Sequence, residues 1–425
     1  MTESIMPLRE YPWERALAAP MKNAARKLLF SLLSSLRYGR LTLRDGDICR
    51  TFGGVEPRFP LEATIVVHDP KFYGRVLVGG SVGAGEAYMA GYWSADDLTA
   101  VIRIIVLNES LMTEMEKGWA SLSAPFQRAF HRMRKDTRAG SRANIAAHYD
   151  LGNEFYRLFL DETMTYSCGI FEGPESTLAE ASIAKYDRIC RKLSLSEADH
   201  LLEIGTGWGG FAIHAAGRYG CRVTTTTISG EQYRLASERV ARAGLSERVK
   251  ILFQDYRDLA GRFDKLVSIE MIEAVGHHFY DDFFRVCAER LKPDGAMALQ
   301  AIIIRDDRYR SQLERPDFIK RHIFPGACLP SIAAIADSVA RVTDLRLFHL
   351  EDITAHYART LSLWRERFFA NLDRVRELGY PEPFIRMWEF YLCYCEGSFL
   401  ERYIGDVQMI LTRPLNRMGP ILPAL

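Results

Sequence analysis

The sequence predicts an α/β protein with two parts: a smaller α+β domain at the N-terminus and a larger domain built on a doubly wound parallel sheet. Three observations predict this arrangement. Short alternating runs broken by glycine and proline fill residues 40–78, strand-like and helix-like segments alternate from Ser194 onward, and a glycine-rich turn joins the first of those strands to a helix. In such a sheet the ligand binds at the carboxyl ends of the strands.

Composition and charge set the broad class. The 425 residues allow two or three domains, and 48% hydrophobic with 26% charged residues is typical of globular proteins. With a formal net charge of +1, the chain lacks the excess of positive charge that nucleic-acid binding needs, so we expect no nucleic-acid partner. No window of the sequence reaches the ~18 uninterrupted apolar residues of a membrane-spanning helix.

Eight cysteines are scattered along the chain. Cys393 and Cys395 have no second cysteine pair or histidine cluster to complete a zinc site, so we expect buried thiols and no metal. No apolar secretory leader precedes the cysteines, and the sequence therefore predicts a reduced, cytoplasmic protein.

The predicted N-terminal domain spans residues 1–125. Residues 21–40 combine a leucine stripe with lysines and arginines, which predicts a helix that either lies on an anionic membrane or packs on its own domain. The run at 63–67 predicts a strand of a small sheet, and a last apolar helix continues past Asn108.

A basic segment, residues 126–143, is the predicted linker. It is either a solvated connector or a strip that faces phosphate groups. Its cations, with almost no acids between them, are Arg128, Arg132, Arg134, Lys135, Arg138 and Arg142.

The predicted strands of the larger domain alternate with turns and helices. They lie at 200–204, 222–227, 250–253, 265–269 and 296–303, with helices that start at Phe211 and Ser229. No internal repeat or low-complexity stretch interrupts this pattern.

The turn after the first of these strands reads Glu203-Ile-Gly205-Thr-Gly207-Trp-Gly209-Gly. A dinucleotide fingerprint has GxGxxG spacing and an acid on the next strand, but here the spacing is GxGxGG, the acid precedes the glycines and the next strand ends in threonines. This pattern resembles that of S-adenosylmethionine-dependent methyltransferases. The alternative is a tight turn with a structural role alone.

Two further segments follow strand ends, where ligands bind. The segment from Thr227 to Gln232 offers hydroxyl and amide groups to ribose hydroxyls, and Gln254-Asp255-Tyr256-Arg257 is placed to flank an adenine.

A series of motifs in one order then resembles the cyclopropane-fatty-acid synthase branch of class I methyltransferases, which includes the mycolic acid cyclopropane synthases. The motifs are His148-Tyr149-Asp150-Leu-Gly-Asn153, Tyr166-Ser167-Cys168, Glu203 to Gly210, residues 253–259, Met271-Ile-Glu273-Ala-Val-Gly276, Phe318-Ile, residues 323–330 and Tyr357-Ala-Arg-Thr-Leu361. The resemblance implies a seven-stranded, Rossmann-like methyltransferase sheet with helical lid insertions over residues 144–425.

The N-terminal part also resembles the extra domain of the full-length bacterial synthases, through residues 67–72 and 83–93. The resemblance implies a lipid-binding domain that docks the protein peripherally on the inner face of the membrane. A homodimer is carried over from the relatives in the same way.

The resemblance implies transfer of a methyl group from S-adenosylmethionine to the double bond of an unsaturated acyl chain in a phospholipid, with loss of a proton to close a cyclopropane. An alkene is a poor nucleophile, so the reaction needs proximity, a dry pocket and a base beside the transferred methyl group. Members of this family use a bound bicarbonate ion as that base, so the resemblance implies bicarbonate here as well. By motif position, its cradle is Cys168, Glu273, Gln300, Ile302 and Tyr357.

Each of these residues also has an ordinary structural explanation, and only their joint occurrence favours a site. The residues expected to contact the methyl donor are Tyr166, Ser167, Glu203, Gly205, Gly207, Thr227, Gln232, Asp255 and Tyr256. Tyr149, Tyr166 and Tyr309 are candidates for stabilising a cation through their ring faces.

Three positions depart from the well-known bacterial pattern: Thr206 stands for Cys, and Ala274 and Gln300 each stand for His. Gln cannot titrate, so it can hold an anion without relaying its proton. The product therefore stays open between a cyclopropane and a methyl- or methylene-branched chain. More distant alternatives are a small-amine N-methyltransferase and a lipid-binding protein without catalysis.

Overall fold

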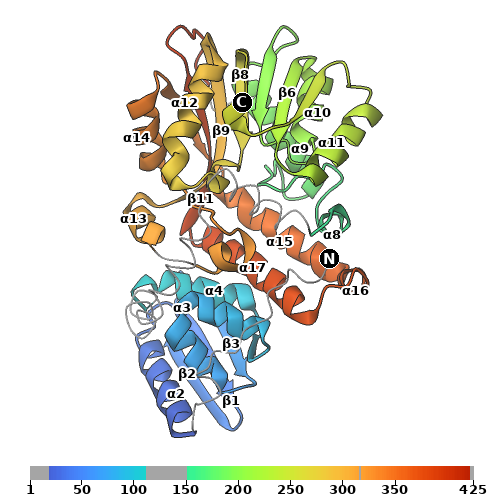
Figure 1. The fold of residues 1–425 in the computed structure, drawn as a ribbon. Coiled ribbons are helices and arrows are strands. Elements are labelled where there is room, and N and C mark those ends of the chain that lie inside the picture. The colour runs from blue at the N-terminus through green and yellow to red at the C-terminus, as the bar shows by residue number, and fades with distance from the viewer. Residues whose placement is uncertain (1–18, 112–150, 315–316, 422–425) are drawn as a thin grey trace. The chain divides into compact units, whose positions relative to one another are not determined.

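The structure is a computed structural model that describes residues 19–111, 151–314 and 317–421 (Figure 1). The chain divides into two compact units. The smaller unit comprises residues 1–133, 312–325 and 364–403, and the larger unit comprises 134–311, 326–363 and 404–425. The predicted domain boundaries at 125 and 143, and the basic segment 126–143, lie outside the described residues and stay predictions.

The smaller unit contains a four-stranded sheet in the order β2-β1-β3-β4. Its strands are β1 (Gly39–Asp45), β2 (Ile48–Gly54), β3 (Glu62–Val67) and β4 (Trp93–Ala95). Alternate residues of β1, Leu41 and Leu43, are fully buried, as expected for a sheet with one face on the core. The predicted strand at 63–67 is confirmed within β3.

The remaining elements of the smaller unit are helical. They are α2 (Ala19–Leu33), α3 (Lys71–Met89), α4 (Leu98–Leu107), η4 (Ile319–Ile323), α16 (Leu372–Glu377) and α17 (Glu382–Leu400). Leu29 and Leu33 of α2 are buried, so the leucine stripe packs on its own domain. The helix ends at Leu33 and not near 40, because β1 begins at Gly39.

The larger unit contains a seven-stranded sheet in the order β10-β11-β9-β8-β5-β6-β7. Neighbouring strands from β9 to β7 are parallel, and β11 pairs antiparallel with both β9 and β10. The strands are β5 (His200–Ile204), β6 (Arg222–Thr227), β7 (Val249–Phe253), β8 (Phe263–Ile269), β9 (Leu291–Ile304), β10 (Arg346–Asp352) and β11 (Ile404–Thr412). The five strands expected from the alternation of strands and helices are confirmed, and β9 starts earlier than predicted.

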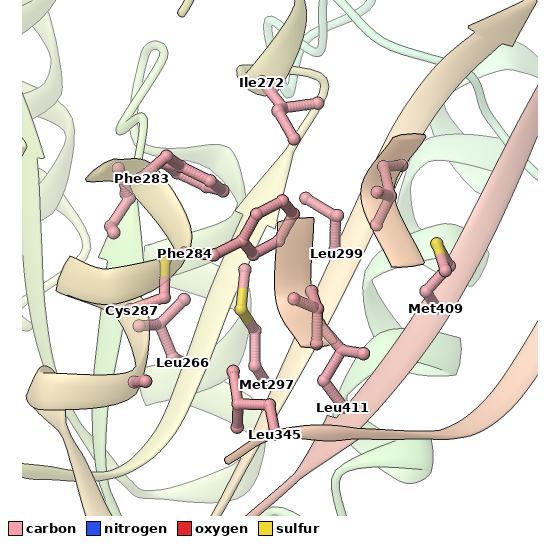
Figure 2. Close-up of a cluster of buried hydrophobic side chains, with 14 of the residues drawn as sticks. Leu266, Ile272, Phe283, Phe284, Cys287, Met297, Leu299, Leu345, Met409 and Leu411 are labelled. Carbon is pink, nitrogen blue, oxygen red and sulfur yellow. The ribbon is translucent and has the colours of Figure 1, made fainter. Parts of the chain in front are cut away.

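Side-chain alternation along the strands builds a core on each face of this sheet. Leu202 of β5 belongs to a cluster with Phe284 of α12 (Tyr280–Arg290), while its neighbour Leu201 belongs to a cluster with Phe211 of α10 (Gly210–Tyr219). Figure 1 shows α9, α10 and α11 on one side of the sheet and α12 and α14 on the other. Figure 2 shows part of the first cluster, with Met297 and Leu299 of β9 directed toward α12.

The other helices of the larger unit are α8 (Asn153–Arg157), α9 (Leu178–Lys192), α11 (Gly230–Arg242) and α14 (Ile332–Val342), with short turns η1 (Tyr256–Asp258), η2 (Ile272–Ala274) and η3 (His277–Phe279). Helices α13 (Asp306–Glu314) and α15 (Thr354–Ala370) each run across a boundary between the two units. Thr177 and Glu180 form a capping box that fixes the start of α9.

Within the described residues, no helix combines the length and the apolar character needed to cross a membrane.

Candidate functional site

The strand order of the larger sheet reverses at β5. From β5 the chain continues to β6 on one side, and it later returns to β8 on the other side. Such a reversal opens a crevice at the carboxyl ends of the parallel strands, where ligands bind in open α/β sheets. The loops after β5, β6 and β8 therefore define the candidate site.

The glycine-rich turn after β5 requires glycine at the predicted positions. Gly205 has φ +102° and Gly207 has φ +52°, a region that side chains other than glycine rarely adopt. A Cβ atom on Gly205 would lie 3.2 Å from Cγ of Met271, whereas one on Gly207 would have nothing within 4 Å. The turn thus presents open backbone at the N-terminus of α10, a place suited to the polar end of a ligand.

Glu203, one residue before the end of β5, is buried against the neighbouring strand. The Thr225 hydroxyl on β6 donates to its Oε2 atom at 2.5 Å, and Thr225 also contacts the Thr206 hydroxyl at 2.7 Å. Burial raises the pKa of Glu203 to about 8, so the carboxyl is protonated at neutral pH. A neutral acid at this point acts as a hydrogen-bonding group and adds no net charge to the crevice.

The end of β6 is organised by a local hydrogen-bond cluster. The Thr227 hydroxyl donates to Oε1 of Gln232 at 2.8 Å, and Ser229 caps α11 by accepting from the Gln232 backbone N–H. These bonds hold the Gln232 amide with its oxygen toward the strand. The predicted ribose-binding pair Thr227 and Gln232 is thereby brought together.

The segment after β7 carries the last two predicted cofactor contacts. Both oxygens of Asp255 accept from the Arg257 guanidinium, at 2.8 and 2.7 Å. The Tyr256 ring packs edge-on against Phe283 with centroids 5.6 Å apart. The carboxylate of Asp255 is therefore held in place before any ligand arrives.

Residues 166–168 lie against α9. The Tyr166 ring packs on Tyr156 with centroids 5.4 Å apart, and Nζ of the fully buried Lys185 donates to the Ser167 hydroxyl at 2.6 Å. Burial raises the pKa of the Cys168 thiol well above its ordinary value. The thiol of Cys168 is buried, while its backbone N–H donates to Oε1 of Glu270 at 2.8 Å.

Three of the five predicted cradle residues converge on one carboxylate, that of Glu270. Oε1 of Glu270 accepts from the Cys168 backbone N–H at 2.8 Å and from Nε2 of Gln300 at 2.7 Å. Oε2 accepts from the Tyr357 hydroxyl at 2.6 Å. Glu270 directly follows β8, and its backbone N–H donates to the Gln300 carbonyl at 2.9 Å.

The other two cradle residues meet each other. The Ile302 backbone N–H donates to Oε1 of Glu273 at 2.5 Å. Oε2 of Glu273 is buried and has no hydrogen-bond partner among the residues that the structure describes. Burial and then the charge of Glu270 raise the pKa of Glu273 to about 8, so Glu273 is protonated at neutral pH.

A second layer of polar groups on β11 fixes Gln300. Gln408 donates through Nε2 to Oε1 of Gln300 at 3.0 Å, and Lys192 donates to Oε1 of Gln408 at 2.8 Å. Asp406 accepts from Nε2 of Gln300 at 3.1 Å, and burial followed by the charge of Glu270 raises its pKa well above the ordinary value. The Gln300 amide therefore has one orientation, with its donor group toward Glu270.

Sequence reasoning missed four of these groups: Glu270, Asp406, Gln408 and Lys185. For Glu270 a signal was present, because a carboxylate directly after an apolar strand lies at the ligand edge of a parallel sheet. The candidate Tyr149 and the motif around it lie outside the described residues. Tyr309 packs against the core on the α12 side of the sheet, and burial raises its pKa to about 12.

Comparison with known proteins shows the family to which the chain belongs. A family model described as Mycolic acid cyclopropane synthetase matches residues 136–409. The chain is 39% identical over 406 residues to the tuberculostearic acid methyltransferase UfaA1 of Mycobacterium tuberculosis, an alignment that covers 93% of this chain and 92% of the relative. This chain belongs to the mycolic acid cyclopropane synthetase family.

Other relatives agree. The cyclopropane-fatty-acyl-phospholipid synthase of Escherichia coli is 38% identical over 354 residues, which cover 83% of this chain and 88% of the relative. The crystal structure of mycolic acid cyclopropane synthase CmaA1 complexed with SAH and CTAB has a TM-score of 0.60 and 33% identity, covering 64% of this chain and 98% of the other. The prediction of family and of fold class is confirmed.

Membership in this family makes the protein an S-adenosylmethionine-dependent methyltransferase that acts on unsaturated fatty acyl chains. The residues fit the methyl donor, because the open backbone at Gly207, the N-terminus of α10 and the Thr227–Gln232 pair share one strand edge. When bound, S-adenosylmethionine supplies the methyl group as an electrophile. The cofactor contacts expected of Glu203 and Gln232 stay predictions.

Proposed function

We propose that this protein transfers the methyl group of S-adenosylmethionine to the double bond of an unsaturated phospholipid acyl chain and forms a cyclopropane. The observation that carries the proposal is an acidic cluster of Glu270, Glu273 and Asp406, of which Glu273 and Asp406 are buried. Met271, next to Glu270 in the sequence, lies 3.2 Å from a Cβ atom built on Gly205. The loop that carries Glu270 therefore approaches the glycine-rich turn, which supports a base close to the methyl donor.

The chemistry sets the requirements. The π electron pair of the alkene forms the new bond to the methyl carbon, and the bond from that carbon to sulfur breaks with its pair left on sulfur. The neighbouring carbon becomes a cation that water would quench, so water must be excluded. A base then takes a proton from the transferred methyl group, and the C–H pair closes the ring.

The residues around Glu270 meet these requirements. Cys168, Glu273, Gln300 and Tyr357 are all buried, which keeps bulk water from the cluster. Tyr357 and Gln300 hold the carboxylate through donors that cannot move freely, because each donor belongs to a different packed element. Such preorganisation favours transition states in which charge develops.

A second product is favoured by a specific observation. The relative that covers 93% of this chain is named for methylation and not for ring formation. A hydride shift to the cation before proton loss would give a methylene branch from the same intermediate. The sites of methyl transfer and of proton acceptance are the same for both products.

The product is tested by incubating the purified protein with methyl-deuterated S-adenosylmethionine and vesicles of an unsaturated phospholipid, followed by ozonolysis and mass spectrometry. A labelled product that resists ozone and gives three-membered-ring fragments supports the cyclopropane. A labelled product that ozone cleaves supports branching, and an absence of labelled lipid contradicts both.

We also propose that the smaller unit binds an acyl chain. It contains a cavity of about 110 Å³ whose walls are almost entirely apolar and include Leu41, Val76, Ala84, Ile105 and Phe390. An apolar cavity of about 150 Å³ is known to stay dry and to take up benzene, so this one has room for a short apolar segment.

The substitution Ala84→Leu narrows the cavity. It should weaken the affinity for an unsaturated fatty acid several-fold, as measured by calorimetry. Ala24→Leu on the exposed face of α2 is the matched control and should bind as the wild type does. Equal binding by both variants would contradict a role for the cavity.

Peripheral association with the inner face of the membrane, a cytoplasmic location and a homodimer stay predictions. Binding to anionic phospholipid vesicles that weakens with added salt would support the basic segment as a membrane contact, because salt screens exposed charges. Binding that is insensitive to salt would leave apolar insertion as the cause.

A further inference from the structure

We propose that the carboxylate of Glu270 occupies the place expected for bicarbonate and itself accepts the proton that the transferred methyl group releases. This inference rests on the proposed function, because it names the base of that reaction. It starts from a disagreement between the cradle predicted from the sequence and the contacts that those residues make.

The cradle residues do not fit a free bicarbonate ion. Of the donors expected to hold it, the Cys168 N–H, the Gln300 amide and the Tyr357 hydroxyl all bond to Glu270, at 2.8, 2.7 and 2.6 Å. The fourth, the Ile302 N–H, bonds to Glu273. A bicarbonate ion would have to displace a carboxylate that is covalently part of the chain and already has three donors.

Charge also opposes a second anion. Glu270, Glu273 and Asp406 lie close enough that the charge of Glu270 raises the pKa of both other carboxyls. Lys185 is the fully buried cation that faces this group, and burial lowers its own pKa. An added anion here would repel Glu270 in a medium that screens charge poorly.

The three carboxyls are not equivalent. Burial and the charge of Glu270 raise the pKa of Glu273 to about 8 and that of Asp406 well above its ordinary value, which favours the protonated form of both. Glu270 instead receives three hydrogen bonds, all from neutral donors: the Cys168 backbone N–H, the Gln300 amide of β9 and the Tyr357 hydroxyl of α15. These bonds fix both oxygen atoms of the Glu270 side chain in one position.

A weakly basic carboxylate is sufficient for this step. The C–H bond next to a carbocation is strongly acidic, so proton loss needs a correctly placed acceptor more than a strong one. The proton moves from the methyl carbon to a carboxylate oxygen of Glu270, and the electron pair of that C–H bond forms the new carbon–carbon bond. No co-reactant beyond the methyl donor and the alkene is required.

The backbone at Glu270 supports a functional role. Its φ is +47°, in the left-handed region that a non-glycine residue adopts at a cost. This conformation, held by the bond from its N–H to the Gln300 carbonyl, places the side chain among the three donors. A glycine at this position would adopt the same backbone with less strain and would empty the cradle.

The orientation of Gln300 agrees with a carboxylate of the chain in the cradle. Its oxygen is taken by Gln408, so its NH₂ group faces Glu270 and Asp406. A histidine in this place could titrate, whereas the amide is a constant donor. The departure from the bacterial pattern at Gln300 is therefore compatible with a resident carboxylate.

The first test uses the wild-type protein in buffer depleted of carbon dioxide, with unsaturated phospholipid vesicles and labelled S-adenosylmethionine. The rate should be the same within twofold with and without added bicarbonate. A rate that falls on depletion and returns with bicarbonate would overturn the inference and leave the proposed function intact. Absence of labelled lipid in either buffer would instead overturn the proposed function.

The second test compares two variants. Glu270→Gly should lower turnover in depleted buffer by roughly 10²- to 10⁴-fold. Added bicarbonate or formate should then raise the turnover of this variant at least roughly tenfold. Glu270→Gln fills the cradle without a base, so it should lose as much turnover and gain nothing from either anion.

The affinity of both variants for S-adenosylmethionine, measured by calorimetry, separates loss of the base from loss of folding. It should stay within about twofold of the wild type. A Glu270→Gln variant with wild-type turnover, or a folded Glu270→Gly variant that no anion rescues, would overturn the inference.

Discussion

The two halves of the ligand edge in the larger unit are built in different ways. At the ends of β5 and β6, the site is made of residues close in sequence, with bonds that span 5 and 22 positions. At the ends of β8, β9 and β11, bonds to Glu270 span 30, 87 and 102 positions. The first half is a local motif, and the second exists only once distant segments have packed.

The two halves also differ in charge. The half around Gln232 presents hydroxyl and amide groups, while the half around Glu270 presents three carboxyl groups, of which Glu273 and Asp406 are buried and have raised pKa values. We infer that the first half binds the methyl donor and the second performs the proton transfer. Substitutions should therefore separate affinity from turnover.

The largest effect outside Glu270 itself is expected for Tyr357→Phe. This change removes the hydroxyl that donates to Oε2 of Glu270 while keeping the ring. A hydrogen bond to a charged group contributes about 1.5–3 kcal/mol, so turnover should fall roughly 10- to 100-fold. Affinity for S-adenosylmethionine, measured by calorimetry, should change less than twofold.

Tyr309→Phe is the matched control, because this half-buried tyrosine packs on the core and makes no bond to Glu270 among the bonds of the described residues. Its turnover should equal that of the wild type. Equal losses in the two variants would remove Tyr357 from the reaction.

A smaller, opposite effect is expected for Gln232→Leu. The change removes the amide that Thr227 orients, so affinity for S-adenosylmethionine should fall about five- to tenfold, the effect of one neutral hydrogen bond. Turnover at saturating cofactor should be retained. Glu238→Gln, on the exposed face of the same helix, is the control; a fall in turnover without loss of affinity would contradict the division between the two halves.

The last expected effect concerns stability and not activity. The pKa of Glu203 is raised to about 8 from an ordinary value of 4.5, so the folded protein keeps a proton that the unfolded chain releases between these values. The free energy of unfolding should therefore fall as pH rises from about 4.5 to 8, by at most roughly 1.4 kcal/mol per pH unit for this group. Glu203→Gln should flatten that slope in urea titrations, and an unchanged slope would show that Glu203 is ionised in the folded state.

These differences explain what could be predicted from the sequence. Strands β5, β8 and β9 are visible as apolar runs because parallel strands are buried on both faces, whereas β6 is a buried run of β-branched threonines. The cofactor half is visible because its motifs are local. The cradle residues Cys168, Gln300 and Tyr357 were identified through a family resemblance, and the structure brings them together.

The acceptor within the cradle could not be predicted in the same way. The run Glu270-Met-Ile-Glu273 contains two glutamates, and nothing local tells which one reaches the donors. The choice depends on a left-handed backbone at Glu270 and on Gln408 and Asp406 of β11, which is separated from β8 by more than a hundred residues. Tertiary packing therefore decides a catalytic role that sequence pattern leaves open.

The measurement that tests the account most directly is the number of deuterium atoms that the lipid product retains from methyl-deuterated S-adenosylmethionine. If a base beside the transferred methyl group removes one of its hydrogens, mass spectrometry should find two deuterium atoms on each transferred carbon, for a ring or a methylene branch alike. Retention of all three would show that the methyl group leaves the enzyme intact, and would contradict a proton acceptor at Glu270.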